Sequence, residues 1–339
     1  MTIADLVPAP SADAPTSAAD GQRTGAARHV SSGSAWRAEH AAQLEDAVRV
    51  ADEWRASRPG LAPDPAALAT VLYERWYAPA AVLPAPDPLL PPLAGALRQA
   101  HVGAESWLDA TVLRTGPAGL LLVARPGEPP RAVVRGDHTH PPTSDRRGLP
   151  PVPGEAVRVR ERRDAPPTEG WWRTWGPGWN LLTPPTGLTR LYLAPEPEHV
   201  AALVREVTTA TRSLTVPWML KVAEHRAALA RPDAMVLYLA QDLATVLDAL
   251  AARVVAATAG RLRAASPALT FALAPGLAAA EDPGDGRSFG EQCCALVADA
   301  LVHDPAGDDP IARVAHTFAA AEIDPAQPYL RAARPQDRP

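Results

Sequence analysis

The second half of the chain alternates short apolar runs with segments of helical periodicity, and this alternation constrains the fold more than any other feature. The runs TRLYLA, PWMLKVA and AMVLYLA all lie within residues 188–240. Runs of this length, rich in Leu, Val and Tyr, are typical of buried strands. Helix-like segments lie at 195–213 and 243–259. Strands that alternate with helices predict an α/β region with the features of a catalytic domain.

The first half has a different pattern. Apolar residues at helical spacing predict helices at 36–57 and 93–101, and Asp64 followed by Pro65 predicts a helix start between them. Short strand-like runs then follow up to about residue 162, separated by turns. The sequence therefore predicts a mixed α+β fold with a helical N-terminal part and a small antiparallel sheet before the α/β region. The expected boundaries are 1–34 for a disordered tail, 35–105 for the helical part, 106–170 for the small β region, 171–325 for the α/β domain and 326–339 for a second tail.

Composition narrows the class of protein. The net charge of −5 gives no basic field for nucleic acid, and no apolar run approaches the roughly 20 residues that span a bilayer. The N-terminus lacks the pattern of a secretory signal, and the two cysteines are adjacent at Cys293 and Cys294. We therefore expect a reduced, cytoplasmic protein without a membrane or nucleic-acid partner. The scattered histidines form no metal-ligand pattern, so we expect no metal and no cofactor.

Lys221 is the only lysine among the 33 basic residues. Lysine can lose its proton at workable pH and act as a base or nucleophile, whereas arginine stays charged. The alternative is a lysine that remains on the surface by chance. Its flanks, Pro-Trp-Met-Leu before and Val after, indicate a buried strand, in which desolvation lowers the pKa of an amine.

Three further groups of polar residues accompany the strand-like runs. Arg190 and Tyr192 are two apart, so on a strand they share a face, where Arg190 either grips a phosphate or lies on a solvated edge. His225 follows Lys221 by four positions and meets it only if that segment is helical. Arg231 and Asp233 precede the third run, where the acid either caps a turn or fixes a nearby cation.

Two other segments are candidate binding elements. The loop EDPGDGRSFG contains Arg287 and a predicted helix start at Ser288, whose free backbone N–H groups would favour an anion. Four of the nine tryptophans lie within WWRTWGPGW, so Trp172 and Trp175 belong either to a packed cluster or to the wall of a peptide groove. Nucleotide-binding, kinase and serine-hydrolase fingerprints are absent.

The order of four motifs carries a resemblance to a known family. The motifs are TRLYLAP, PWMLKV, RPDAMVLYL and LAPGLAAAEDPGDGRSFG. Together they resemble the HopA-type effector domain, first named in plant-pathogen type III secretion. Similar proteins occur in actinobacterial gene clusters for ribosomal peptides, beside an aminoglycoside-phosphotransferase-like kinase. The resemblance covers about residues 171–301.

The resemblance implies a function in lanthipeptide or thioamide-peptide maturation. There the kinase phosphorylates Ser or Thr of a precursor peptide, and the HopA-like protein is assigned the elimination of phosphate to give dehydroalanine or dehydrobutyrine. Such a lyase needs a base, for which Lys221 is the candidate, and a proton donor, either His225 or Tyr192. Arg190, Arg287 and Arg231 would bind the phosphate, with Trp172, Trp175 and Asp233 along the peptide groove.

Two departures from the expected family pattern keep other functions open. Ala194 follows the RLYL motif where an Asn is expected, and Cys293–Cys294 stand where an Arg is expected. A non-catalytic partner that holds the leader peptide or the kinase is therefore the alternative to the lyase. An effector-like interaction protein without any peptide-modifying role is the third possibility.

Overall fold

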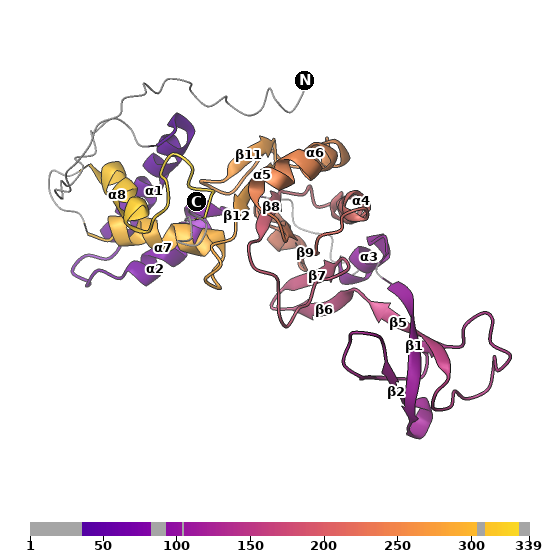
Figure 1. The fold of residues 1–339 in the computed structure, drawn as a ribbon. Helices are drawn as coiled ribbons and strands as arrows, with labels where there is room; N and C mark the ends of the chain where they lie inside the picture. The colour runs from indigo at the N-terminus through magenta and orange to yellow at the C-terminus, as the bar shows by residue number, and fades with distance from the viewer. Residues whose placement is uncertain (1–35, 83–92, 104, 304–308, 332–339) are drawn as a thin grey trace, which may run out of the picture.

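The computed structural model describes residues 36–82, 93–103, 105–303 and 309–331. The tail expected at 1–34 lies outside this range, as does the second expected tail, 326–339, from residue 332 onward. Residues 326–331 are described, and Tyr329 among them is buried. Within it, two antiparallel sheets and several helices form a mixed α+β fold, as the sequence predicts. Figure 1 shows the large sheet in the body of the molecule and the small sheet projecting from one end.

The N-terminal helices form where the sequence predicts them, but they pack against two different groups of helices. Helix α1 spans Ala38–Ala56, and α2 spans Pro65–Leu72 and continues as the π-helix Tyr73–Tyr77. The Asp64 carboxylate accepts a hydrogen bond from the Ala67 amide and so caps α2. These helices pack against the C-terminal helices α7 and α8, whereas α3, Leu93–Ala100, packs against α4.

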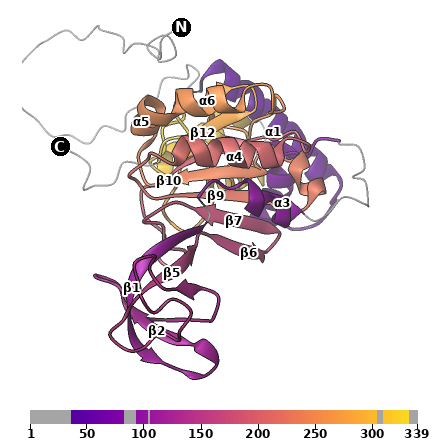
Figure 2. The ribbon, with the colours of Figure 1, turned by 90° about the vertical axis from the view of Figure 1, so that its right-hand side faces the viewer.

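The small sheet has its own apolar core. Its strand order is β3-β2-β1-β5-β4, and its buried side chains are mostly valines from alternate positions of β1, β2 and β5. The 3-10 turn Pro117–Gly119 joins β1 to β2. Figure 2 shows the sheet hanging below the main body. The strands are β1 Glu105–Thr115, β2 Leu121–Ala124, β3 Arg131–Val133, β4 His138–Thr139 and β5 Ala156–Arg162.

The large sheet has the order β11-β12-β8-β10-β9-β7-β6, with every neighbour antiparallel. The three apolar runs of the sequence become β8, β9 and β10 at its centre. The strands are β6 Asp164–Thr168, β7 Trp171–Trp175, β8 Thr189–Leu193, β9 Trp218–Ala223, β10 Met235–Leu239, β11 Phe271–Ala274 and β12 Leu277–Glu281. Strand β6 belongs to this sheet, although the sequence pattern places it in the small β region.

Strand β12 is not evident from the sequence. The segment from 273 to 290 resembles a Gly/Pro loop in sequence, yet Leu277–Glu281 pairs with β8 along its whole length. Ala278, Ala279 and Ala280 have weak strand propensity, but all three are fully buried. Because successive side chains of a strand point to opposite faces, their burial means that both faces of the strand are covered, so tertiary packing overrides local preference.

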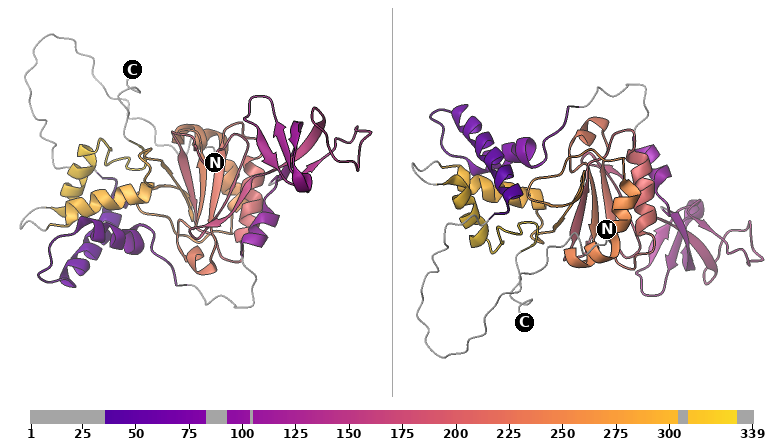
Figure 3. Two further views of the ribbon diagram at one scale, coloured as in Figure 1. Left: turned by 90° about the horizontal axis from the view of Figure 1, so that it is seen from below. Right: turned by 90° about the horizontal axis from the view of Figure 1, so that it is seen from above.

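Helices cover both faces of the large sheet. Figure 3 shows the sheet on edge, with α4 and α6 on one side and α1, α2, α7 and α8 on the other. We call the second group the outer helical layer. The helices not yet placed are α4 Val200–Thr211, α5 Leu243–Val246, α6 Ala252–Thr258, α7 Phe289–Leu301 and α8 Pro310–Ala320, with a π-helix at Leu247–Ala251 and a 3-10 helix at Arg226–Ala230. No helix in the part of the chain that the structure describes is long and apolar enough to cross a membrane.

Candidate active site

The register of the large sheet brings Lys221 into a row of polar side chains. Lys221 on β9 lies opposite Arg173 on β7 and Val236 on β10, and Val236 lies opposite Tyr192 on β8. Arg190, two residues before Tyr192, occupies the next row on the same face. Strands β7, β8 and β9 thus place one amine, two guanidinium groups and a phenol on the face that is turned towards the outer helical layer.

A cavity of about 50 Å³ lies between this face and the outer helical layer. It is much smaller than the roughly 300–1,000 Å³ of typical ligand pockets, so it has room for one small group. Tyrosines and charged groups dominate its wall. The lining residues are Tyr73, Tyr77, Trp171, Arg190, Tyr192, Lys221, Asp233, Val236, Tyr238, Ser288 and Gly290.

The Lys221 amine is held without a polar partner. Its Nζ lies 4.1 Å from the centroid of the Trp171 ring, and it makes no hydrogen bond or ion pair with any residue that the structure describes. Burial lowers the pKa of Lys221 to about 8, and the charges of Arg173 and Arg190 act in the same direction. At neutral pH a useful fraction of this amine is therefore free to accept a proton.

Arg190 is fixed at the floor of the cavity. Its side chain is buried, its Nε donates to an Asp282 carboxylate oxygen at 2.8 Å, and its Nη2 binds the same oxygen. Its Cζ lies 5.1 Å from the centroid of the Tyr238 ring. These contacts orient the guanidinium and leave Nη1 without a hydrogen-bond partner among the described residues.

Asp233 holds two groups on one side of the cavity. Its carboxylate accepts hydrogen bonds from Arg231 Nε at 2.8 Å and from the Tyr73 hydroxyl at 2.9 Å. The charge of Arg231 is thereby neutralised, and its side chain does not line the cavity. Asp233 therefore fixes a nearby cation, which is one of the two roles that the sequence predicts for it, and it also orients Tyr73.

The N-terminus of α7 closes the cavity from the helical side. Ser288 caps the helix, accepting from the Glu291 amide, while the Glu291 carboxylate accepts from the Ser288 amide. Gly290 is required by packing, because a Cβ there would lie 2.3 Å from Tyr77 Cε1. Free amides and the positive end of the helix dipole therefore face the same space as Lys221 and Arg190.

Besides Arg231 and Trp175, three residues that the sequence places in the site do not line the cavity. The segment after Lys221 stays a strand to Ala223, so His225 does not meet the amine, and its side chain is 72% exposed. Arg287 is exposed and pairs with Asp285 in its own loop. Trp172 is fully buried on the opposite face of the sheet, because successive strand side chains alternate.

Other site residues escaped the sequence reasoning. Trp171 follows from strand parity, because it lies two positions from Arg173 and shares its face. Tyr73 and Tyr77 carry no local signal, since the π-helix meets the sheet only in the folded chain.

Trp175 packs against an apolar cluster of Trp179, Leu188 and Met219. Ala194, Cys293 and Cys294 are buried and do not line the cavity.

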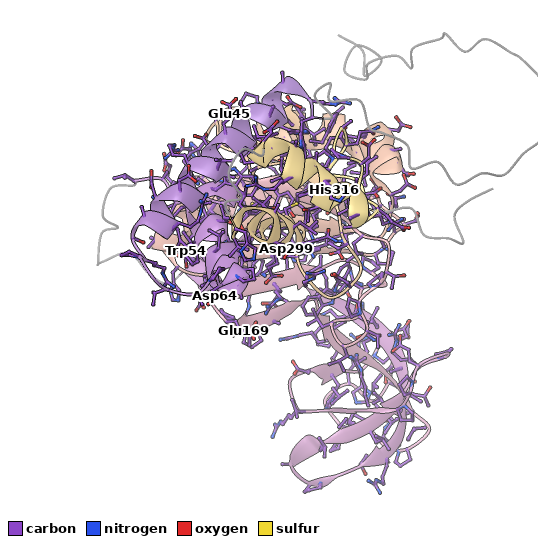
Figure 4. The ribbon with its side chains drawn as sticks, turned by 90° about the vertical axis from the view of Figure 1, so that its left-hand side faces the viewer. Glu45, Trp54, Asp64, Glu169, Asp299 and His316 are labelled. Atoms are coloured by element: carbon purple, nitrogen blue, oxygen red, sulfur yellow. The ribbon has the colours of Figure 1, made fainter. Side chains whose placement is uncertain are left out.

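A larger cleft, of about 500 Å³, lies between α7 and α8. Figure 4 shows two of its lining residues, Asp299 and His316, on the outer helical layer. Among the described residues, none of the buried polar side chains without a partner lines this cleft. The small cavity, which holds two such groups, is therefore the better candidate for chemistry. Nowhere in the described part of the chain do three or more His, Cys, Asp or Glu side chains form a group that could hold a metal ion.

Comparison with solved structures shows that the fold occurs elsewhere. The structure of the effector protein from Pseudomonas syringae pv. tomato strain DC3000 is similar to it, with a TM-score of 0.51 and 17% sequence identity over 86% of this chain and 100% of that chain. A second match, the effector protein from Pseudomonas syringae pv. syringae strain 61, has a TM-score of 0.39 and 22% identity over 48% of this chain and 63% of that chain. At 17% identity, the first likeness shows a shared fold alone.

Comparison with protein families matches one segment of the chain. No curated protein matches the chain. Residues 178–330 match the HopA1 effector protein family, and this segment contains β8, β9 and β10 as well as the N-terminus of α7. The resemblance to HopA-type effectors that the four motifs indicate is thus confirmed, and residues 178–330 carry the sequence pattern of the HopA1 effector protein family.

Proposed function

We propose that this protein is a lyase that eliminates phosphate from phosphoserine or phosphothreonine residues of a peptide. The observation that carries the proposal is Lys221, the only lysine, which lies unpaired and partly desolvated in a cavity that also holds Arg190. A base beside a fixed cation is what β-elimination requires. The small volume of the cavity suits a phosphorylated side chain, with the peptide backbone remaining outside.

The reaction can be followed bond by bond. Lys221 Nζ takes the proton from Cα, the electrons of the broken C–H bond form the Cα=Cβ double bond, and the Cβ–O bond breaks. Phosphate departs with the electron pair of that bond and takes up a proton from the site. Arg190 stabilises the charge that develops on the leaving oxygens. The reaction changes no net oxidation state and therefore needs no oxidant or reductant.

The peptide and its kinase are part of the proposal. A phosphorylated residue must be supplied by a phosphoryl-transfer enzyme, and the chain itself contains no kinase fingerprint. The resemblance to HopA-type proteins supports a ribosomally made precursor peptide as substrate and an aminoglycoside-phosphotransferase-like kinase as partner, in the maturation of a lanthipeptide-like product.

Mass spectrometry of a phosphorylated Ser/Thr peptide tests the proposal directly. Incubation with the protein should remove one phosphoric acid per phosphorylated residue and leave an alkene that thiols trap. The same peptide without phosphate is the matched control and should keep its mass. If phosphate stays on a peptide that nevertheless binds, both alone and with the kinase present, the non-catalytic binding function is the correct one.

The rate should depend on pH through Lys221. The neutral amine is the active form, so with a pKa of about 8 the rate should rise about tenfold per pH unit below 8 and level off above it. An ordinary lysine would give a rate that rises to about pH 10. A kcat/KM profile from pH 6.5 to 10 distinguishes the two, and a continued rise beyond pH 9 would contradict this reading of the amine.

A further inference from the structure

Two buried tyrosine hydroxyls lie close to each other at the cavity. The side chains of Tyr77 and Tyr192 are 1% and 4% exposed, and their hydroxyls lie within reach of each other, but neither makes a hydrogen bond of good geometry within the described residues. Both line the cavity, one from the π-helix after α2 and one from β8. A buried polar group without a partner is unfavourable, so such groups in a native protein call for a ligand or water.

Apart from Asp233, the charged side chains that line the cavity are cations, which favours a ligand that is negatively charged and rich in acceptors. Arg190 Nη1 is unused, Lys221 is unpaired, and the 13-residue helix α7 directs its N-terminus at the cavity through Ser288 and Gly290. Burial raises the pKa of Tyr77 and Tyr192, so both phenols keep their protons and donate. The one carboxylate that lines the cavity, Asp233, already accepts hydrogen bonds from Arg231 and Tyr73.

We infer that the cavity is a binding site for a tetrahedral oxyanion, in which Tyr77 and Tyr192 donate to the oxygens together with Arg190 and the N-terminus of α7. The donors come from a strand and from two helices of the outer layer, and so converge from several directions, as a tetrahedral ion requires and a planar carboxylate does not. The inference deepens the proposed function: the phosphate leaves its carbon inside this site. Free inorganic phosphate should therefore bind there too and compete with the phosphorylated peptide.

The site also explains why phosphate would stay bound after elimination. Tyr77 is held over the helix N-terminus by Gly290, where no larger residue fits, and Arg190 is held by Asp282. A preformed set of donors binds the free ion without a cost of reorganisation. Inorganic phosphate then acts as a product inhibitor, because phosphate that occupies the site excludes the next phosphorylated residue.

Calorimetric titration of the full-length protein with inorganic phosphate at constant ionic strength tests the inference. Wild-type protein should bind phosphate and sulfate but not acetate, which is planar. Tyr77→Phe and Tyr192→Phe should each weaken phosphate binding by about 10- to 100-fold, because each removes a charge-assisted hydrogen bond. Tyr329→Phe is the matched control, since Tyr329 is also buried but lies outside the cavity. Absence of phosphate binding to the wild type, or equal binding by all three variants, would overturn the inference.

Two further measurements separate this inference from its alternatives. Thermal denaturation without phosphate should show Tyr77→Phe and Tyr192→Phe as stable as the wild type or more so, because each removes an unsatisfied hydroxyl; marked destabilisation would mean a structural role instead. Elimination assays on the same proteins separate the inference from the proposed function. Tyrosine-dependent phosphate binding without any elimination supports the oxyanion site and rejects the lyase. Elimination that free phosphate does not inhibit rejects the oxyanion site and leaves the lyase standing.

Discussion

Lys221→Arg should lower the rate of phosphate elimination by about 10²- to 10⁴-fold, the usual contribution of a general base. Arginine keeps the positive charge and a similar length, but it does not lose its proton at any pH that the protein survives. The variant should therefore still bind the phosphorylated peptide, and kcat should fall far more than KM rises. Single-turnover kinetics on a phosphothreonine peptide measures this difference.

The control for this experiment comes from the other side of the large sheet. Arg212 is exposed at the C-terminal end of α4, away from the cavity, and Arg212→Ala should leave elimination unchanged. If Lys221→Arg eliminates phosphate at the wild-type rate, a different residue is the base and the assignment is wrong. If Lys221→Arg is inactive and also fails to bind peptide, the lysine acts in binding and not in proton transfer.

Trp172→Ala should lower the free energy of unfolding by about 3–5 kcal/mol, which is typical of removing a buried aromatic side chain. Trp172 is fully buried at the centre of the main core, on the face of β7 opposite to the cavity. The expected loss includes both the transfer of apolar area and the cavity left behind. Equilibrium urea denaturation followed by circular dichroism gives the change.

The neighbouring tryptophan provides the contrast. Trp171 is half-buried and faces Lys221, so Trp171→Ala should lower the free energy of unfolding by clearly less than Trp172→Ala does. It should instead change the rate of elimination and its dependence on pH, because the indole face favours the charged amine. Equal destabilisation by the two variants would contradict the placement of these side chains on opposite faces.

The sequence predicts the three central strands of the large sheet because each is an apolar run bounded by helices or turns. It also predicts that Arg190 and Tyr192 share a face, since a spacing of two needs no knowledge of the fold. The choice between Trp171 and Trp172 shows the limit of such reasoning. A shift of one residue exchanges the two faces of a strand, and only the pairing of Arg173 with Lys221 fixes which tryptophan faces the cavity.

The remaining site residues depend on contacts between distant parts of the chain. Tyr77 meets Gly290 across more than two hundred residues, and no pattern around either residue announces the other. Strand β12 was missed for a related reason, because alanines become strand residues only when buried between neighbours. The prediction that His225 meets Lys221 required a helix after the lysine. The strand instead continues to Ala223, so the two side chains lie apart.

The way the small sheet is connected to the body determines which parts of the chain can change in length without disturbing the cavity. The segment leaves the body after α3 and returns at β6, and its first and last paired residues, Glu105 and Arg162, lie opposite each other. Topologically it is therefore an insertion whose two ends are neighbours. Lengthening or shortening its hairpins leaves the distance between these ends unchanged, and so does not move β7 or the Lys221 amine. Related chains can thus diversify what this appendage touches while the chemistry of the cavity stays the same.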